Sequence, residues 1–82
     1  MAFTSTNADL ATWTNIATTT ADTVFYNPEA DTVYLTTDTT PSGTSDGVPL
    51  GPGELIVYGS GVTVKGLGVD GVVGVHYHAI GA

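Results

Sequence analysis

The chain has 82 residues, with eight acidic side chains, a single lysine (Lys65), no arginine and no cysteine. A chain this short forms one domain, and its scarcity of cationic side chains argues against direct binding to nucleic acid or to an anionic membrane, which takes several Lys or Arg residues. Without cysteine it has neither disulfides nor thiolate metal sites, so partner subunits are the favoured additional source of stability.

The residue types favour strands over helices throughout the chain. Thr, Val and Gly are abundant, whereas Glu, Lys, Gln, Arg and Met are scarce. Short apolar runs alternate with turn residues, which predicts a small antiparallel β-sandwich or barrel of six to seven short strands. We expect no export signal in the first residues "MAFTSTNADL" and no membrane span, because no apolar segment approaches about 20 residues.

Residues 1–10 are mostly polar, with Phe3 and Leu10 as their apolar anchors. They predict an extended N-terminal arm that becomes ordered against a partner, followed by a single β-domain over residues 11–82. A first strand is expected around Trp13 and Ile16. Because tryptophan is enriched at interface hot spots, we predict that Phe3, Leu10 and Trp13 bind a partner, with ordinary core packing as the alternative for Trp13.

The next two strands are predicted in "DTVFYNP" and "DTVYLTT". Alternation places Val24 and Tyr26 on one face of the first strand, and Val33 and Leu35 on one face of the second. The residues between them, "NPEAD" at 27–31, are typical of a turn. The sequence therefore predicts that these two strands form a hairpin.

The middle of the chain is rich in glycine and proline, which favour turns. A polar loop over residues 38–47 leads into "GVPLGPGE", where Pro52-Gly53 is a natural centre for a type II turn. Val48 and Leu50 are expected to fold back on the core. The stretch is therefore predicted to reverse the chain into the strand "ELIVY".

The last part of the chain predicts two further strands. A turn at "GSG" precedes "VTVKGLGV", in which Val62 and Val64 share one face. The dipeptide Asp70-Gly71 is a strong hairpin signal and leads into the final strand, "VVGVHYHAI".

The candidate chemical groups are few. His76 and His78 alternate on one face of the final strand and are close enough to share a metal, although zinc takes three or four ligands. A symmetry axis of an oligomer could supply the others, but histidines on a solvent or subunit surface are the favoured interpretation. The carboxylates lack calcium-loop spacing and are interpreted as solvated loop residues, and no nucleophile or phosphate-binding motif occurs. We therefore expect no enzymatic activity and no cofactor.

The order of these signals resembles small bacteriophage virion proteins. In that family a strand of the "N…TVYL" type leads through a polar loop to a "G.PL.PGE" turn and a late β-rich segment. The match covers about two thirds of the chain, from Asn27 to the C-terminus. It depends on Asn27, Thr32-Val33-Tyr34-Leu35, Gly47, Pro49-Leu50 and Pro52-Gly53-Glu54.

The resemblance implies a capsid decoration (cement) protein on the outer surface of the virion. Such a protein would bind the major capsid protein, bridge neighbouring capsid subunits and form a homo-oligomer, typically a trimer at three-fold positions. Its acidic surface would suit a basic shell and an exterior position, away from the packaged genome. The alternative is a β-module of a fibre or tail that binds a host glycan or receptor.

Overall fold

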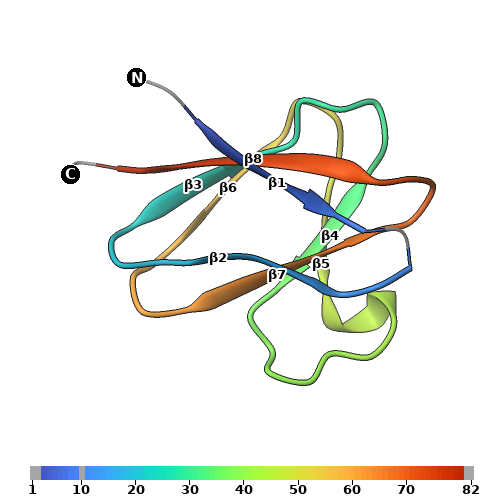
Figure 1. Cartoon of the computed structure of the whole chain (residues 1–82), viewed down its shortest axis with the longest axis horizontal. Coiled ribbons are helices and arrows are strands. Elements are labelled where there is room, and N and C mark those ends of the chain that lie inside the picture. The colour runs from blue at the N-terminus through green and yellow to red at the C-terminus, as the bar shows by residue number, and fades with distance from the viewer. Residues whose placement is uncertain (1–2, 10, 81–82) are drawn as a thin grey trace.

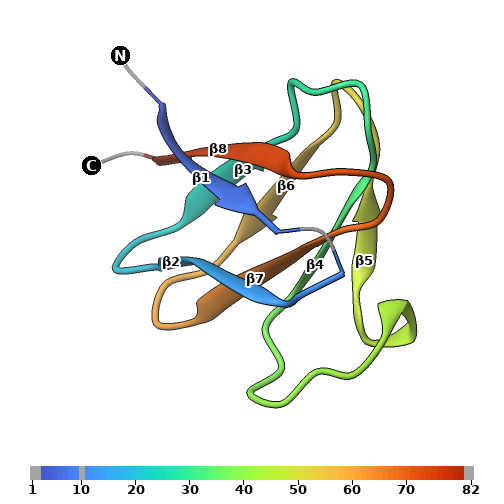
Figure 2. The same ribbon diagram turned by 45° about the vertical axis from the view of Figure 1, so that its right-hand side comes forward.

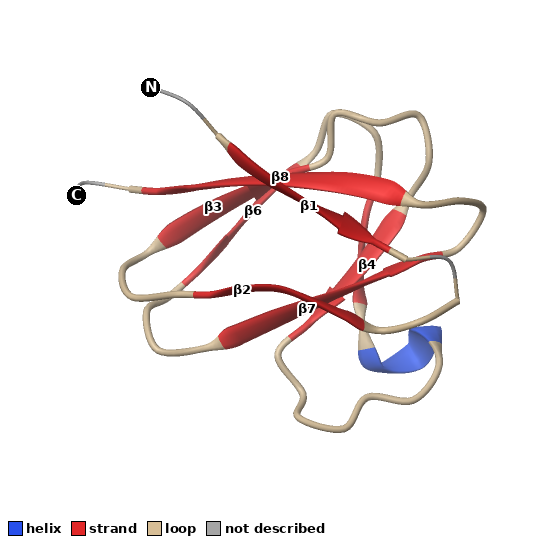
Figure 3. Ribbon diagram, in the orientation of Figure 1, coloured by secondary structure: helices blue, strands red, loops and turns tan. Residues whose placement is uncertain are grey.

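The computed structural model describes residues 3–9 and 11–80, which form two four-stranded antiparallel sheets packed face to face (Figure 1). In spatial order, sheet A contains β1 (Thr4–Ala8), β8 (Val73–Ala79), β3 (Thr23–Tyr26) and β6 (Leu55–Tyr58). Sheet B contains β2 (Thr14–Thr18), β7 (Thr63–Gly68), β4 (Val33–Thr36) and β5 (Val48–Leu50). A short 3-10 helix, η1 (Thr44–Asp46), precedes β5 (Figure 3). The all-β prediction is confirmed, with eight strands instead of six or seven.

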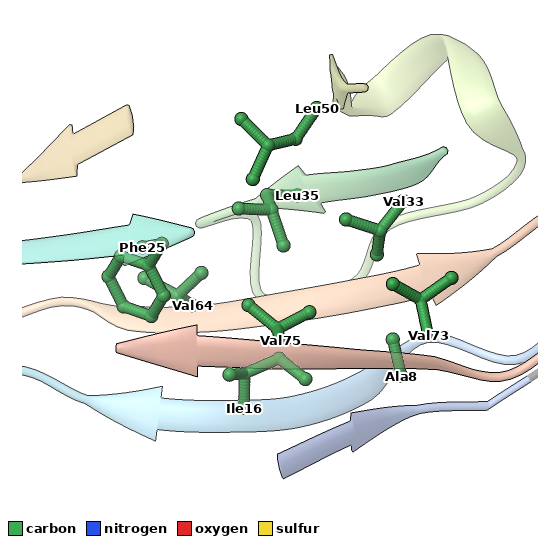
Figure 4. Close-up of a cluster of buried hydrophobic side chains, with 9 residues drawn as sticks. All are labelled: Ala8, Ile16, Phe25, Val33, Leu35, Leu50, Val64, Val73 and Val75. Atoms are coloured by element: carbon green, nitrogen blue, oxygen red, sulfur yellow. The ribbon is translucent and has the colours of Figure 1, made fainter. Parts of the chain in front are cut away.

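The core lies between the two sheets and follows from alternation along their strands. Phe25 of β3 and Val75 of β8 point inward from sheet A, and Leu35 of β4 and Val64 of β7 point inward from sheet B (Figure 4). All four side chains are completely buried. Because full burial of one such side chain contributes about 1.5–3 kcal/mol, this layer is the main source of stability.

Consecutive strands alternate between the sheets. Every connection except the one between β4 and β5 passes from one sheet to the other (Figure 2). The two predicted hairpins are therefore wrong, since β3 and β4 belong to different sheets, as do β7 and β8. A turn signal reports a local change of direction, whereas the sheet that receives the next strand is decided by which apolar faces meet across the core.

The N-terminal segment is a paired strand in place of the expected extended arm. β1 pairs with β8 in the register Thr6↔Val75 and Ala8↔Val73, and Ala8 is completely buried in the core. The remaining residues of the strand are polar, so they show no apolar alternation from which an edge strand could have been predicted. Met1, Ala2 and Leu10 lie outside the described residues.

The stretch "GVPLGPGE" divides into an edge strand and a turn. Leu50 of β5 is buried opposite Val33, whereas Val48 is half exposed, so the expectation of a core contact is correct for Leu50 and wrong for Val48. After β5, the N–H of Glu54 donates to Gly51 O at 3.1 Å, and Gly53 has a φ of +77°. Gly53 is the third residue of this turn and directly follows Pro52. A positive φ at that position is the geometry of a type II turn, as predicted.

The single lysine helps to close the long loop between β4 and β5. Lys65 Nζ donates to the carbonyl oxygens of Asp38 at 3.3 Å and of Thr39 at 2.7 Å. Within the same loop the N–H of Ser42 donates to Asp46 Oδ2 at 2.6 Å.

No helix among residues 3–9 and 11–80 has the length and apolar character that crossing a bilayer takes.

Candidate interaction surface

The outer surface of sheet A is apolar over β3 and β6 and polar over β1, where Ser5 and Asn7 lie opposite His76 and Gly74. Side chains that alternate with the core residues point away from sheet B, and the strand pairing places Tyr26 between His76 and Leu55, and Val24 between His78 and Val57. Phe3 lies beside both His76 and His78, on the side away from β6. We call this surface outer face A and define it by Phe3, Val24, Tyr26, Leu55, Val57, His76 and His78.

An aromatic cluster forms one half of outer face A. The ring centroid of Phe3 lies 5.7 Å from that of His78, 6.4 Å from His76 and 6.3 Å from Tyr26. The rings of Tyr26 and His76 meet edge to face, with 6.4 Å between their centroids. These rings contact each other with much of their surface still open to solvent, and Phe3 remains 41% exposed. The cluster is therefore available for a further apolar contact.

The two histidines have aromatic neighbours and, in the described part of the chain, no third ligand. His76 and His78 share one face of β8 next to Phe3. Among residues 3–9 and 11–80, no group of three or more His, Asp or Glu side chains could hold a metal ion. A metal at this pair would need ligands from outside the described residues.

Valine and leucine side chains of β6 form the other half of outer face A. Leu55 is 62% exposed and Val57 is 56% exposed, the two highest values among the large apolar side chains described. On the opposite side of the strand, Ile56 and Tyr58 pack against the core but remain half-buried. Sequence reasoning predicted a strand here without noticing that its alternate apolar residues have nothing to cover them.

No acidic residue belongs to a strand. All eight carboxylates lie in connections or in η1, and none lies on a strand; they are Asp9, Asp22, Glu29, Asp31, Asp38, Asp46, Glu54 and Asp70. Outer face A is therefore bordered by carboxylates, and one of them, Glu29, reaches the same surface of sheet A, with Oε2 3.0 Å from the position that a Cβ on Gly74 would take. This arrangement combines an apolar contact surface with an acidic rim, which is the usual anatomy of a protein interface.

The outer surface of sheet B is different in character. The hydroxyls of Thr18 and Thr63 are hydrogen-bonded at 3.0 Å, and Lys65 is engaged with the loop after β4. The ring of Trp13 packs over Gly47, where a Cβ would lie 2.7 Å from its Cη2 atom and 3.1 Å from Tyr34 Cβ. Trp13 is thus occupied within its own chain and does not lie with Phe3.

The indole of Trp13 has one further feature. Its Nε1 is buried and has no hydrogen-bond partner among the described residues. A buried donor without a partner destabilises the fold, unless an acceptor is supplied from elsewhere. The proposed partner role of Trp13 therefore depends on this single atom. Leu10, which was also predicted to bind a partner, lies outside the described residues.

A small hollow lies at the end of the sandwich where β2 turns into β3. Its volume is about 250 Å³, and its lining includes Thr19, Thr23, Tyr77 and His78. Thr19 Oγ1 donates to Gly59 O at 2.7 Å and Thr23 Oγ1 donates to Ala21 O at 2.9 Å, so these hydroxyls already serve the fold. The lining contains no carboxylate, and the volume is below that of ordinary small-molecule sites.

Comparisons with protein-family models, with curated proteins and with solved structures find no match to this chain.

Proposed function

We propose that this chain is a structural protein of a bacteriophage virion, a decoration protein that binds the outer surface of the capsid. The observation that supports this most directly is the exposed apolar surface of β6, since Leu55 and Val57 are more than half exposed and no acidic residue belongs to a strand. Such a surface serves to bind another protein. The proposal takes the type of assembly from the sequence resemblance and the contact surface from the fold.

Binding would combine two physical contributions. Burial of Phe3, Leu55 and Val57 against the shell stabilises the complex by roughly 25 cal/mol per Å² of apolar area removed from water. The acidic rim is attracted to a basic shell surface, which speeds association and orients the domain. Repetition over the capsid then turns a modest contact into a strong one wherever a domain touches two neighbouring capsid subunits.

The proposal includes a homo-oligomer, with three copies around a symmetry axis of the shell. Its support is the short chain without cysteine, whose core of nine buried residues is small. Domains of this size commonly gain stability from partner subunits. Monomers bound singly, away from any symmetry axis, would contradict this part of the proposal.

A fibre or tail module that binds a host glycan is the second candidate. The hollow favours it through the exposed Thr20 and the half-buried rings of Tyr77 and His78, because a hydroxyl beside aromatic rings suits a sugar. The two candidates differ in copy number. A count that matches the capsid lattice supports decoration, whereas a few copies per particle support a fibre or tail.

The test is binding of the purified protein to capsids that lack it, followed by imaging of the particles. We expect density in a regular lattice on the outer surface. Phe3→Glu, which charges outer face A, should weaken attachment, whereas Val48→Glu, at a similarly exposed apolar residue on β5, should leave it unchanged. Equal attachment of both variants, or absence of the protein from the capsid surface, would overturn the proposal.

A further inference from the structure

The strand β6 has an open hydrogen-bonding edge. It is the last strand of sheet A, and within residues 3–9 and 11–80 it pairs with β3 alone. The N–H of Asn27 donates to Glu54 O at 3.1 Å, which identifies that pair as a hydrogen-bonded one. Because hydrogen-bonded and non-hydrogen-bonded pairs alternate in an antiparallel ladder, the next residues along β6 alternate as well. Ile56 and Tyr58 bond to β3, and the backbone groups of Leu55 and Val57 point to the open side.

The other three edges of the sandwich carry features that discourage pairing. β5 has only three residues and contains Pro49. β2 has a bulge between Asn15 and Ala17. β1 consists of Thr, Ser and Asn apart from the buried Ala8. By contrast β6 contains no proline, charge or bulge, and natural proteins rarely leave such an edge uncovered.

Carboxylates lie near both ends of β6. Glu54 directly precedes the strand, and its Oε1 accepts the N–H of Gly51. Beyond the other end of β6, Asp22 Oδ1 lies 3.8 Å from the position that a Cβ on Gly59 would take. A second copy paired antiparallel to β6 would bring Glu54 of one chain towards the Asp22 end of the other, so like charges would meet. An incoming segment with basic residues at its ends would instead meet opposite charges at both places.

We propose that β6 accepts an added strand from a basic partner protein. The segment has apolar residues at alternate positions, which cover Leu55 and Val57, and Lys or Arg at each end, beside Glu54 and Asp22. Its backbone bonds to the open N–H and C=O groups of Leu55 and Val57, which is recognition by strand addition. We take the capsid to be the source of this segment. Only that assignment rests on the proposed function.

The probe is a synthetic heptapeptide with lysine at each end and alternating valine and threonine between them. We expect it to bind the free domain one to one and to slow amide hydrogen exchange at Leu55 and Val57. A peptide with glutamate in place of the lysines should bind at least about tenfold more weakly, because two attractive contacts become repulsive. A peptide with every internal amide N-methylated should not bind, since it cannot form the ladder.

Variants of the domain identify the edge. Val57→Pro removes an N–H that points away from β3, so it spares the ladder with β3 and should weaken the lysine peptide about tenfold or more. Val57→Lys, which keeps that N–H and places a charge on the edge, should weaken it as well. Val48→Lys, a matched change at another half-exposed valine, should not. Circular dichroism checks that each variant is folded.

Three outcomes would overturn the inference. They are the absence of peptide binding, equal binding of the N-methylated peptide, and a concentration-dependent dimer that Val57→Lys abolishes, which would make a second copy the occupant. The peptide experiment needs no virion. A domain that binds the peptide at β6 but never attaches to capsids would leave the inference standing and overturn the proposed function. A domain that decorates capsids without binding the peptide would do the reverse.

Discussion

Asn27 and Leu50 are joined by a hydrogen bond of 2.8 Å from Asn27 Nδ2 to the carbonyl oxygen of Leu50. The second N–H of the same amide donates to Asp31 O at 2.8 Å, and its Oδ1 accepts the N–H of Glu29 at 2.9 Å. Asn27 is completely buried, so one polar side chain satisfies three backbone groups, of which the bond to Leu50 O is buried and the other two are partly buried.

The backbone of Asn27 extends this connection to the turn before β6. Its N–H donates to Glu54 O, and its carbonyl accepts the N–H of Gly53 at 2.7 Å. The residue therefore holds the β3–β4 connection against the β5–β6 connection. Two crossings between the sheets are fixed at one point.

Replacing Asn27 should destabilise the fold far more than replacing an exposed asparagine. Asn27→Ala leaves the buried carbonyl of Leu50, the partly buried carbonyl of Asp31 and the N–H of Glu29 without this partner, and we expect the free energy of unfolding to fall by about 2–4 kcal/mol. Asn27→Asp has the same shape, but its carboxylate would face two carbonyl oxygens, so its effect at neutral pH should be at least as large. Urea denaturation measures both changes. The control is Asn15→Ala on the exposed side of β2, and equal losses at the two positions would contradict the role of Asn27.

The positive φ of Gly53 predicts a purely conformational cost. No atom lies within 4 Å of the position that a Cβ would take there, so Gly53→Ala introduces no clash. An alanine with a φ of +77° should nevertheless lower stability by about 1–2 kcal/mol. Gly59→Ala, which has neither a positive φ nor a close contact, should be neutral or stabilising by up to about 1 kcal/mol. Thermal unfolding compares the two, and similar melting temperatures would refute the type II turn.

The position of β1 predicts that the N-terminal segment contributes to stability. Deleting Met1 to Leu10 removes the completely buried Ala8 and exposes the edge of β8, so we expect a loss of about 3 kcal/mol or more. The point variant Ala8→Asp, which buries a charge, should be similarly damaging, whereas Thr4→Asp at an exposed residue of the same strand should not. If the truncated chain had an unchanged free energy of unfolding, the result would contradict a stabilising role of β1 and would favour the extended arm expected from the sequence.

Tyr58 predicts a loss of stability at alkaline pH. Partial burial beside Phe25 raises the pKa of its phenol above the usual value of 10.0. Because the folded pKa lies above the unfolded one, this contribution is complete below pH 10 and is lost as the pH rises through the folded value. Between about pH 9 and pH 11, the range around an ordinary phenol pKa, Tyr58→Phe should lose less stability than the parent protein. Denaturation at each pH measures this difference. An equal loss in both would show that other groups dominate.

The sequence by itself determined the all-β class, the polar loop and the local turn geometry. β-branched residues and period-two alternation act within a few residues, and they placed Val33 and Leu35 on one face, which is the face buried in the core. The type II turn at Pro52-Gly53 depends on the φ preferences of those two residues alone. Each of these features is decided by short-range sterics, which a linear pattern reports directly.

Only the tertiary structure decided which strands pair. The segments on either side of "NPEAD" look like a hairpin in the sequence, yet Asn27 is buried between two crossings and sends the chain to the other sheet. β1 was missed because its partner, β8, lies at the far end of the chain. The exposed face of Leu55 and Val57 was missed for the same reason. Pairing depends on contacts between residues distant in sequence, and the apolar faces that must cover each other across the core select among locally equivalent turns.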